Sequence, residues 1–248
     1  MTFETRQFEL VAGEAEKFDE LIGRAKCVLF DFDGPICRLF AGHSAKGIAT
    51  GLEEWLAARG LAGVLTEGER GSRDPHWVLS KVAGRHRGSD LVVELEEWLT
   101  QQELRAVARA MPTAYADPLI RTWGAVGTRL AVVTNNSDRA VRAYLESRHL
   151  VGYFAPNIYG RTRDLRLLKP HPHTLNRALR ALGAAPDTTL MIGDTPSDHA
   201  AARSAGVHFL GYARNEAKAR TLLDAGVARW NIVDSLETVL RAVRGGAA

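Results

Sequence analysis

The apolar residues change their spacing along the chain, and these changes predict the order of helices and strands. From residue 14 to 26, apolar side chains recur at 15, 18, 21, 22 and 25, which is the spacing of one helix face. An unbroken apolar run follows over 27–30 and predicts a short buried strand. After a helix that ends near Trp123, short apolar runs alternate with amphipathic segments. We expect strands at 129–133, 157–159, 189–192, 208–211 and 231–233, and helices at 139–148, 173–182, 200–205 and 217–225, with a last helix ending at 243.

This alternation indicates the fold class. Apolar strands separated by amphipathic helices are typical of a parallel sheet with helices on both sides, so we predict a doubly wound, Rossmann-like α/β core. The stretch between the first strand and Pro118 differs, because it shows helical spacing at 45–59, 76–82 and 91–111 and no buried strand. We therefore predict that an all-helical cap, residues 37–115, is inserted into a core formed by 1–36 and 116–248.

Composition and charge narrow the classes of protein that fit this pattern. The chain has 248 residues, 46% hydrophobic and 25% charged, as in ordinary globular proteins. The net charge is only +3 and the basic residues are spread out, so we expect no nucleic-acid partner. Residues 1–23 lack the basic start and apolar run of a signal peptide, and no stretch is apolar enough to cross a membrane. With only Cys27 and Cys37 as thiols, we expect a cytoplasmic protein without a membrane partner.

Two carboxylates, Asp31 and Asp33, stand at the end of the first predicted strand and are followed by Gly34. Side chains alternate along an extended segment, so both acids fall on the same side. At about 4 Å they would repel by roughly 4 kcal/mol at an effective dielectric near 20, so the pair favours a metal or another cation. An ordinary Asp-Gly turn, in which Asp33 bonds only to nearby backbone, is the competing interpretation.

Polar residues also stand at the ends of later strands. Thr134–Ser137 follow the strand at 129–133, and Asp194 follows the strand at 189–192. Lys169 lies between these two segments, and Asp198 lies near the start of the next helix. Helix capping would explain Asp198 and part of the 134–137 segment, but it does not explain Asp194. In open parallel sheets ligands bind beyond the carboxyl ends of the strands, so these residues are expected to form one site.

The order Asp31-x-Asp33-Gly34, Thr134, Lys169 and Gly193-Asp194-x-x-x-Asp198 resembles the haloacid dehalogenase-like hydrolase superfamily. Within it, the chain is similar to the phosphatases with a helical cap after the first motif, such as phosphoglycolate phosphatases. The resemblance extends over about residues 27–211. It implies a Mg²⁺-dependent enzyme that hydrolyses a small-molecule phosphomonoester through an aspartyl-phosphate intermediate.

The resemblance also implies roles for the acids. Asp31 would be the nucleophile, and Asp33 would protonate the leaving alcohol and then activate water. Dehalogenases of this type do not need the second acid, so Asp33 favours phosphate chemistry. Mg²⁺ would bind the side chains of Asp31 and Asp194 and the backbone carbonyl of Asp33. Asp198 would support this set of ligands or orient Lys169 rather than bind metal directly.

The remaining motif residues would hold the phosphoryl group. By resemblance, Thr134, Asn135 and Lys169 contact its oxygens, and Gly34 belongs to the same phosphate-binding set. Two departures from the family pattern weaken a more specific substrate assignment. Pro35 stands where threonine is common, and residues 36–39 lack the usual Asp-Ser.

Two other functions stay open on the same scaffold. A phosphomutase would transfer the phosphoryl group within a sugar phosphate rather than to water. A non-catalytic phosphate-binding or regulatory protein would be expected to have lost Asp31 or Asp33, and the chain keeps both.

Basic residues gather in one part of the predicted cap and again just before Lys169. They could meet an anionic substrate, but in an arginine-rich chain we expect most of them to face solvent. They are Arg70, Arg73, His76, Lys81, Arg85, His86 and Arg87 in the cap, and Arg161, Arg163 and Arg166 before Lys169.

Overall fold

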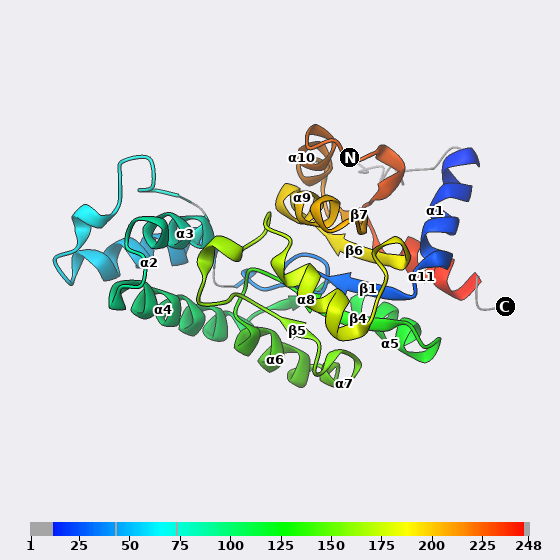
Figure 1. Ribbon diagram of the computed structural model, residues 1–248, viewed down its shortest axis with the longest axis horizontal. Helices are drawn as coiled ribbons and strands as arrows, with labels where there is room; N and C mark the ends of the chain where they lie inside the picture. Colours follow the sequence, from blue (N-terminus) through cyan, green and yellow to red (C-terminus); the bar gives the residue numbers. More distant parts are fainter. Residues whose placement is uncertain (1–11, 43, 73, 246–248) are drawn as a thin grey trace, which may run out of the picture.

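Six parallel strands form the central sheet of the computed structural model, which describes residues 12–42, 44–72 and 74–245 (Figure 1). The spatial order of the strands is β5-β4-β1-β6-β7-β8, so the first strand lies in the middle of the sheet. Val28 of β1 pairs with Leu130 of β4 on one side and with Leu190 of β6 on the other. The strands are β1 (Cys27–Phe30), β4 (Arg129–Val133), β5 (Ile158–Tyr159), β6 (Thr189–Gly193), β7 (His208–Tyr212) and β8 (Ile232–Val233).

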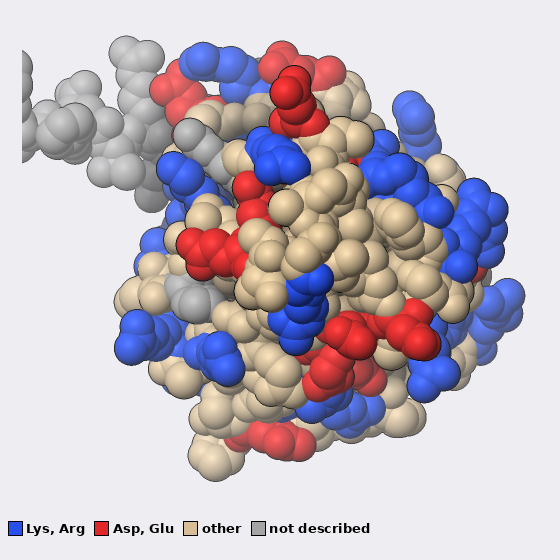
Figure 2. Space-filling model, turned by 90° about the vertical axis from the view of Figure 1, so that its left-hand side faces the viewer, with Lys and Arg blue, Asp and Glu red and all other residues tan. Residues whose placement is uncertain are grey.

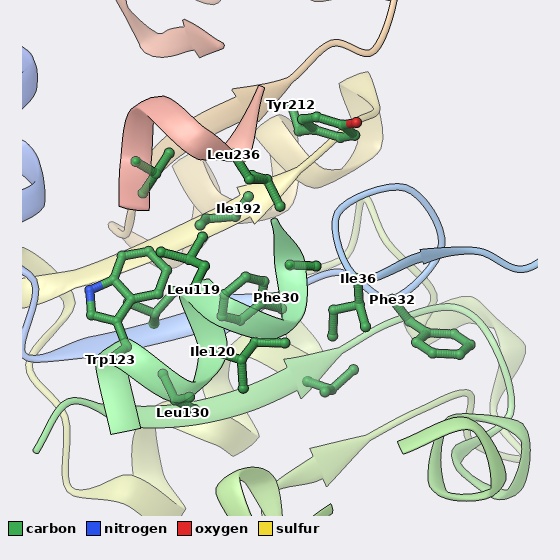
Figure 3. Packing of buried hydrophobic residues seen from close by; sticks show 14 of the residues in the cluster. Phe30, Phe32, Ile36, Leu119, Ile120, Trp123, Leu130, Ile192, Tyr212 and Leu236 are labelled. Carbon is green, nitrogen blue, oxygen red and sulfur yellow. The ribbon is translucent and has the colours of Figure 1, made fainter. Parts of the chain in front are cut away.

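Helices cover both faces of this sheet, because its strands are apolar on both sides. Val28 and Phe30 of β1 pack into one cluster of buried side chains, whereas Cys27 and Leu29 pack into another. On the first face, the ring of Phe30 lies edge-on to Trp123 at 5.7 Å between centroids (Figure 3). That face is covered by α1 (Ala12–Arg24), α5 (Ala116–Ala125), α6 (Asp138–Ser147), α7 (Val151–Phe154) and α11 (Leu236–Gly245). The other face is covered by α8 (His173–Leu182), α9 (Pro196–Ala205) and α10 (Glu216–Asp224).

The cap has a hydrophobic cluster of its own. Its helices are α2 (Ala45–Ala57), α3 (Pro75–Arg85) and α4 (Asp90–Val107), which lie beside the core at the left of Figure 1. Ser44 caps α2 by accepting a hydrogen bond from the backbone of Gly47, and Asp74 caps α3 in the same way. The 3₁₀ helices are η1 (Ala62–Val64), η2 (Leu165–Leu167), η3 (Pro186–Thr188) and η4 (Arg229–Asn231). Of these, η2 belongs to the core segment before α8 but contributes Leu165 to the cap cluster.

The doubly wound core and the helical cap are confirmed, with differences at the ends of elements. Two short antiparallel strands, β2 (Cys37–Arg38) and β3 (Met111–Pro112), lie at the two ends of the predicted cap segment. The sequence did not predict them, because two residues are too few to show a strand periodicity. The helix predicted at 200–205 begins earlier, at Pro196, because Thr195 and Asp198 form a capping box. The junctions at 36/37 and 115/116 stay a prediction.

The sequence predicts no segment that crosses a membrane, and the length and apolar character of the helices test this prediction. Within the described residues, no helix is both long and apolar enough to cross a bilayer.

Candidate active site

The carboxyl ends of β1, β4 and β6 meet at one edge of the sheet and form a polar cavity. Because these strands are parallel neighbours, the residues that follow them lie together. The cavity has a volume of about 330 Å³. It is lined by all the predicted site residues except Gly34, namely Asp31, Asp33, Thr134, Asn135, Lys169, Asp194 and Asp198. A larger cavity of about 660 Å³ lies near the opposite ends of the strands, beside Lys26 and Arg129, away from these carboxylates.

Lys169 is the buried cation of the site. Its Nζ lies 2.8 Å from Oδ1 of Asp31 and 2.5 Å from Oδ1 of Asp198, and it donates a hydrogen bond to the carbonyl of Val133 at 3.0 Å. Burial by itself would lower the pKa of Lys169. The negative charges of Asp198 and Asp31 raise the pKa by more than burial lowers it, so the pKa lies above the ordinary value of a lysine. Lys169 is therefore charged at neutral pH, and its ammonium lies between Asp31 and Asp198.

The two acids after β1 have different surroundings. Burial raises the pKa of Asp31, the neighbouring Asp198 adds to this rise, and Lys169 opposes it. Burial also raises the pKa of Asp33 to about 6, although a hydrogen bond of 2.8 Å from the backbone N–H of Leu39 acts against the rise. A carboxyl with a pKa near neutrality can both give and take a proton.

Asp194 lies against Gly34 from the first motif. A Cβ atom at Gly34, which has φ of +119°, would lie 2.5 Å from Cγ of Asp194, so only glycine allows this close approach. Gly34 thus shapes the site without lining its cavity. Burial raises the pKa of Asp194 to about 6, while Lys218 opposes the rise through an ion pair of 2.6 Å. Sequence reasoning did not find Lys218, because it lies within α10 and no motif marks it.

The loop after β4 is held by its own side chains. Thr134 Oγ1 donates to Asn136 Oδ1 at 3.1 Å and accepts from the backbone N–H of Asn136. Asn135 Oδ1 accepts from the backbone N–H of Lys169 at 2.8 Å, and its Nδ2 donates to the Lys169 carbonyl at 3.2 Å. The Asn135 side chain is therefore engaged with the main chain of Lys169, which it positions. Ser137 caps α6, as the capping interpretation expected.

Three of the acids lie close enough to share a cation. Asp31, Asp194 and Asp198 each offer a carboxylate oxygen, and these atoms lie within 4.8 Å of one another. Oδ2 of Asp198 also accepts from the backbone N–H of Asp194 at 3.2 Å and from Thr195 Oγ1 at 2.7 Å. Asp198 is therefore occupied by protein donors, whereas Asp194 is held by Lys218, and Asp31 is held by Lys169 and by the backbone N–H of Phe32 at 2.8 Å. Oxygen ligands and an excess of negative charge fit a hard divalent cation such as Mg²⁺.

The basic residues of the cap do not form one patch. Viewed from the cap end, Lys and Arg side chains are scattered among Asp and Glu, which agrees with a solvated face (Figure 2). Arg85 is paired with Glu69 at 2.6 Å, and Arg73 lies outside the described residues. His76 is different, because it lines the active-site cavity. Arg161 is also different: it is buried, so the interpretation of this residue as solvent-facing is wrong.

Comparisons with known proteins agree with this geometry. A family model described as haloacid dehalogenase-like hydrolase matches residues 25–206. The chain is 32% identical over 193 residues to the phosphoglycolate phosphatase of Rhodospirillum rubrum, covering 73% of this chain and 77% of that one. Among solved structures, a HAD-family hydrolase of Deinococcus radiodurans with bound phosphate and sodium superposes with a TM-score of 0.58, at 21% identity, over 91% of this chain and 97% of that one. CbbY of Rhodobacter sphaeroides in complex with phosphate gives a TM-score of 0.57, at 20% identity, over 76% and 86%. The two structural likenesses concern the fold alone.

Proposed function

Because the chain belongs to the haloacid dehalogenase-like hydrolase family, we propose that it is a Mg²⁺-dependent phosphatase that hydrolyses a small phosphomonoester through an aspartyl-phosphate. One observation carries this proposal. Asp31 and Asp33 follow the same strand, and the buried Lys169 lies 2.8 Å from Asp31. A nucleophile, a proton donor and a fixed cation thus line one cavity. The similarity to phosphoglycolate phosphatases supports the same reaction class.

In the first step, a carboxylate oxygen of Asp31 attacks phosphorus while the bond to the leaving oxygen breaks. Asp33 gives its proton to that oxygen, so the alcohol leaves uncharged. A pKa of about 6 keeps part of Asp33 protonated near neutrality. In the second step, Asp33 takes a proton from water, the water oxygen attacks the phosphorus of the aspartyl-phosphate, and Asp31 is released.

The other residues stabilise charge during transfer. Lys169 offers a fixed positive charge to the phosphoryl oxygens, and Thr134 offers a hydroxyl at the end of β4. Asn135 keeps Lys169 in place through the main-chain contacts described above. Asp31, Asp194 and the carbonyl of Asp33 would hold Mg²⁺, which would supply charge neutralisation for the transferring group.

The test is release of inorganic phosphate from a panel of phosphorylated metabolites, with Mg²⁺ and with EDTA. We expect metal-dependent release, and we expect Asp31→Asn to abolish it, by about a thousandfold or more. Asp187→Asn, an exposed acid before β6, is the matched control and should keep full activity. Phosphorylation of Asp31 in acid-quenched enzyme would be detected by mass spectrometry.

Two results would contradict the proposal. Phosphate release that persists in Asp31→Asn would exclude the aspartyl-phosphate. Formation of an isomeric sugar phosphate without free phosphate would show a phosphomutase instead.

A further inference from the structure

A buried cluster of charged side chains joins the cap to the core, and the chemistry described above does not use it. Its centre is Glu103 on α4, whose side chain is fully buried. Burial alone would raise the pKa of Glu103, but Arg161 and His76 more than offset it and lower the pKa to about 2. Glu103 is therefore ionised at neutral pH, and a buried charge of this kind is stable only where other groups bind it.

Arg161 is the residue of the core that Glu103 meets. Its Nη1 donates to Oε1 of Glu103 at 2.9 Å and to the carbonyl of Asn135 at 3.0 Å. Its Nη2 donates to Oε2 of Glu103 at 3.2 Å and to Oγ1 of Thr100 at 2.9 Å, and its Nε donates to Glu96 at 3.0 Å. A guanidinium has five N–H groups, so every one of them has an acceptor within the protein. Arg161 therefore holds protein segments together and has no N–H left for a substrate.

Glu103 and Arg161 together hold the loop that follows β4. Oε2 of Glu103 accepts from the backbone N–H of Ser137 at 2.9 Å, and Oε1 accepts from Nδ2 of Asn136 at 3.1 Å. The backbone N–H of Arg161 donates to the carbonyl of Asn136 at 2.8 Å. This loop is thus fixed by Glu103 from the side of the cap and by Arg161 from the side of the core.

These contacts reach the residues that we propose bind the phosphoryl group. An amide side chain donates at one end and accepts at the other. Since Nδ2 of Asn136 donates to Glu103, its Oδ1 faces Thr134, whose Oγ1 lies 3.1 Å away. The carbonyl of Asn135 is held in the same cluster, and its side chain bonds to the main chain of Lys169. The position of Thr134 is therefore linked to Glu103 through a single side chain.

Glu103 lies where α4 passes from the cap to the core. Leu95 and Leu99, earlier on this helix, belong to the hydrophobic cluster of the cap, whereas Ala106 belongs to a cluster of the core. His76 of α3 adds a contact of 2.8 Å from its Nε2 to Oε1 of Glu103. The place of this carboxylate thus depends on how the cap packs against the core.

We infer that Glu103 is a positioning residue for the phosphoryl-binding loop, and that through Asn136 and Ser137 it keeps the oxygen of Thr134 in place. The inference rests on the proposed phosphatase function and adds to it a residue of the cap that lies outside the four motifs. Glu103 does not touch the reacting atoms. Loss of its charge should therefore weaken the binding of phosphate oxygens in general, whatever alcohol the substrate carries.

The experiment measures the Kd of inorganic phosphate by calorimetry in Mg²⁺, together with kcat and KM for p-nitrophenyl phosphate. We expect Glu103→Gln, which keeps the shape of the side chain, to raise both Kd and KM by about tenfold, the size of one hydrogen bond. A merely structural role would lower the fraction of folded enzyme and so kcat, but it would leave Kd and KM unchanged. Circular dichroism fixes a temperature at which each variant is folded.

Two further variants accompany Glu103→Gln. Glu97→Gln is the matched control, because Glu97 lies on the same helix and pairs with Arg139 of the core at 2.8 Å, but it bonds to Arg139 and Gln101 rather than to the loop. It should change Kd by about twofold or less. Glu103→Asp keeps the charge beside Arg161 with a shorter reach, and should raise Kd by about threefold or more. It replaces Glu103→Gln if that variant does not fold.

A double variant tests the route by which Glu103 acts. When Thr134 is already alanine, Glu103→Gln should raise the Kd of phosphate by only about threefold or less, because the hydroxyl that it positions is gone. A full tenfold rise in both backgrounds would overturn the inference.

The remaining outcomes separate this inference from the proposed function. Unchanged Kd and KM in folded Glu103→Gln, or an equal rise in Glu97→Gln, would overturn the inference while the phosphatase stands. If the wild type binds phosphate but hydrolyses no phosphomonoester, the proposed function fails and the Kd values of the variants still decide the inference. If the wild type neither binds phosphate nor hydrolyses its esters, both are wrong.

Discussion

Two buried clusters of charged residues lie side by side in this protein, and they differ in their balance of charge. At the ends of β1 and β6, four acids share two lysines, Lys169 and Lys218. At the cap boundary, Glu103 meets Arg161 and His76, and Arg161 also pairs with Glu96. Burial raises the pKa of Asp33 and Asp194 to about 6 in the first cluster, whereas the cations lower the pKa of Glu103 to about 2 in the second.

This difference separates the cluster that we propose takes part in the reaction from the cluster that holds neighbouring segments in position. A surplus of carboxylates is unfavourable until a cation or a proton is added, which is the state expected of a metal-binding acid/base site. Glu103 already has cationic partners and needs no ligand, so it can hold the loop after β4 and the ring of His76 in place. Removing a carboxylate should therefore stabilise the first cluster and destabilise the second.

The largest expected effect is the pH dependence of the metal-free protein. Asp33 and Asp194 have model-peptide pKa values of 3.8 that rise to about 6 in the fold, so the folded state binds more protons between these values. The free energy of unfolding should fall as the pH rises from 4 through 6, by on the order of 4 kcal/mol. Urea denaturation in EDTA at several pH values measures this. A free energy of unfolding that rises between pH 4 and pH 6 would contradict an excess of carboxylates in the first cluster.

Next in size is the loss of the charge on Glu103. Its pKa falls from 4.5 to about 2 on folding, so its stabilisation is fully present above pH 4.5 and is lost as the pH falls toward 2. At pH 7, Glu103→Gln should lower the free energy of unfolding by about 3 kcal/mol, because the buried Arg161 then keeps only Glu96, a part-exposed carboxylate, as a charged partner. Urea denaturation at pH 7 gives the value. If Glu103→Gln were as stable as the wild type, the charge of Glu103 would not stabilise the fold, and the proposed difference between the two clusters would be wrong.

The opposite sign is expected for Asp194→Asn in the absence of metal. Replacing a carboxylate that repels its neighbours with a neutral amide should raise the free energy of unfolding at pH 7 by about 1 to 3 kcal/mol. The same variant should lose the thermal stabilisation that the wild type gains from Mg²⁺, about 1.4 kcal/mol at a tenfold excess over Kd. Differential scanning fluorimetry with and without Mg²⁺ records both effects. If Asp194→Asn were less stable than the wild type without metal, repulsion between the carboxylates could not be what destabilises the first cluster.

The smallest effect is expected at a second ion pair between cap and core. Arg139 on α6 lies 2.8 Å from Glu97 on α4, but both side chains are about half exposed, at 53% and 51%. Solvent screens this pair, so Arg139→Ala should cost about 0.5 kcal/mol or less. It serves as the matched control for Glu103→Gln in the same urea titrations. A cost as large as that of Glu103→Gln would show that burial is not what distinguishes the two pairs.

The sequence by itself determined the order of the core elements and the motifs at the strand ends. The strands at 129–133, 189–192 and 208–211 could be predicted because buried parallel strands are uniformly apolar. The convergence of Asp31, Thr134 and Asp194 followed from topology, because parallel neighbours end at the same edge of the sheet. Asp198 belongs to the capping box of α9, as the capping interpretation expected, and its Oδ1 lies 2.5 Å from Nζ of Lys169; its role toward Lys169 stays a prediction.

Only the tertiary structure decided which other charged residues join the site. Arg161 and Glu103 are 58 positions apart, and no local spacing relates them. Nothing in the sequence distinguishes the buried Arg161 from the exposed Arg163 and Arg166, because burial depends on how the cap meets the core. Lys218 reaches Asp194 from α10, 24 positions away. Periodicity records which face of an element is apolar, but the pairing of charges across a domain boundary depends on packing that no single segment encodes.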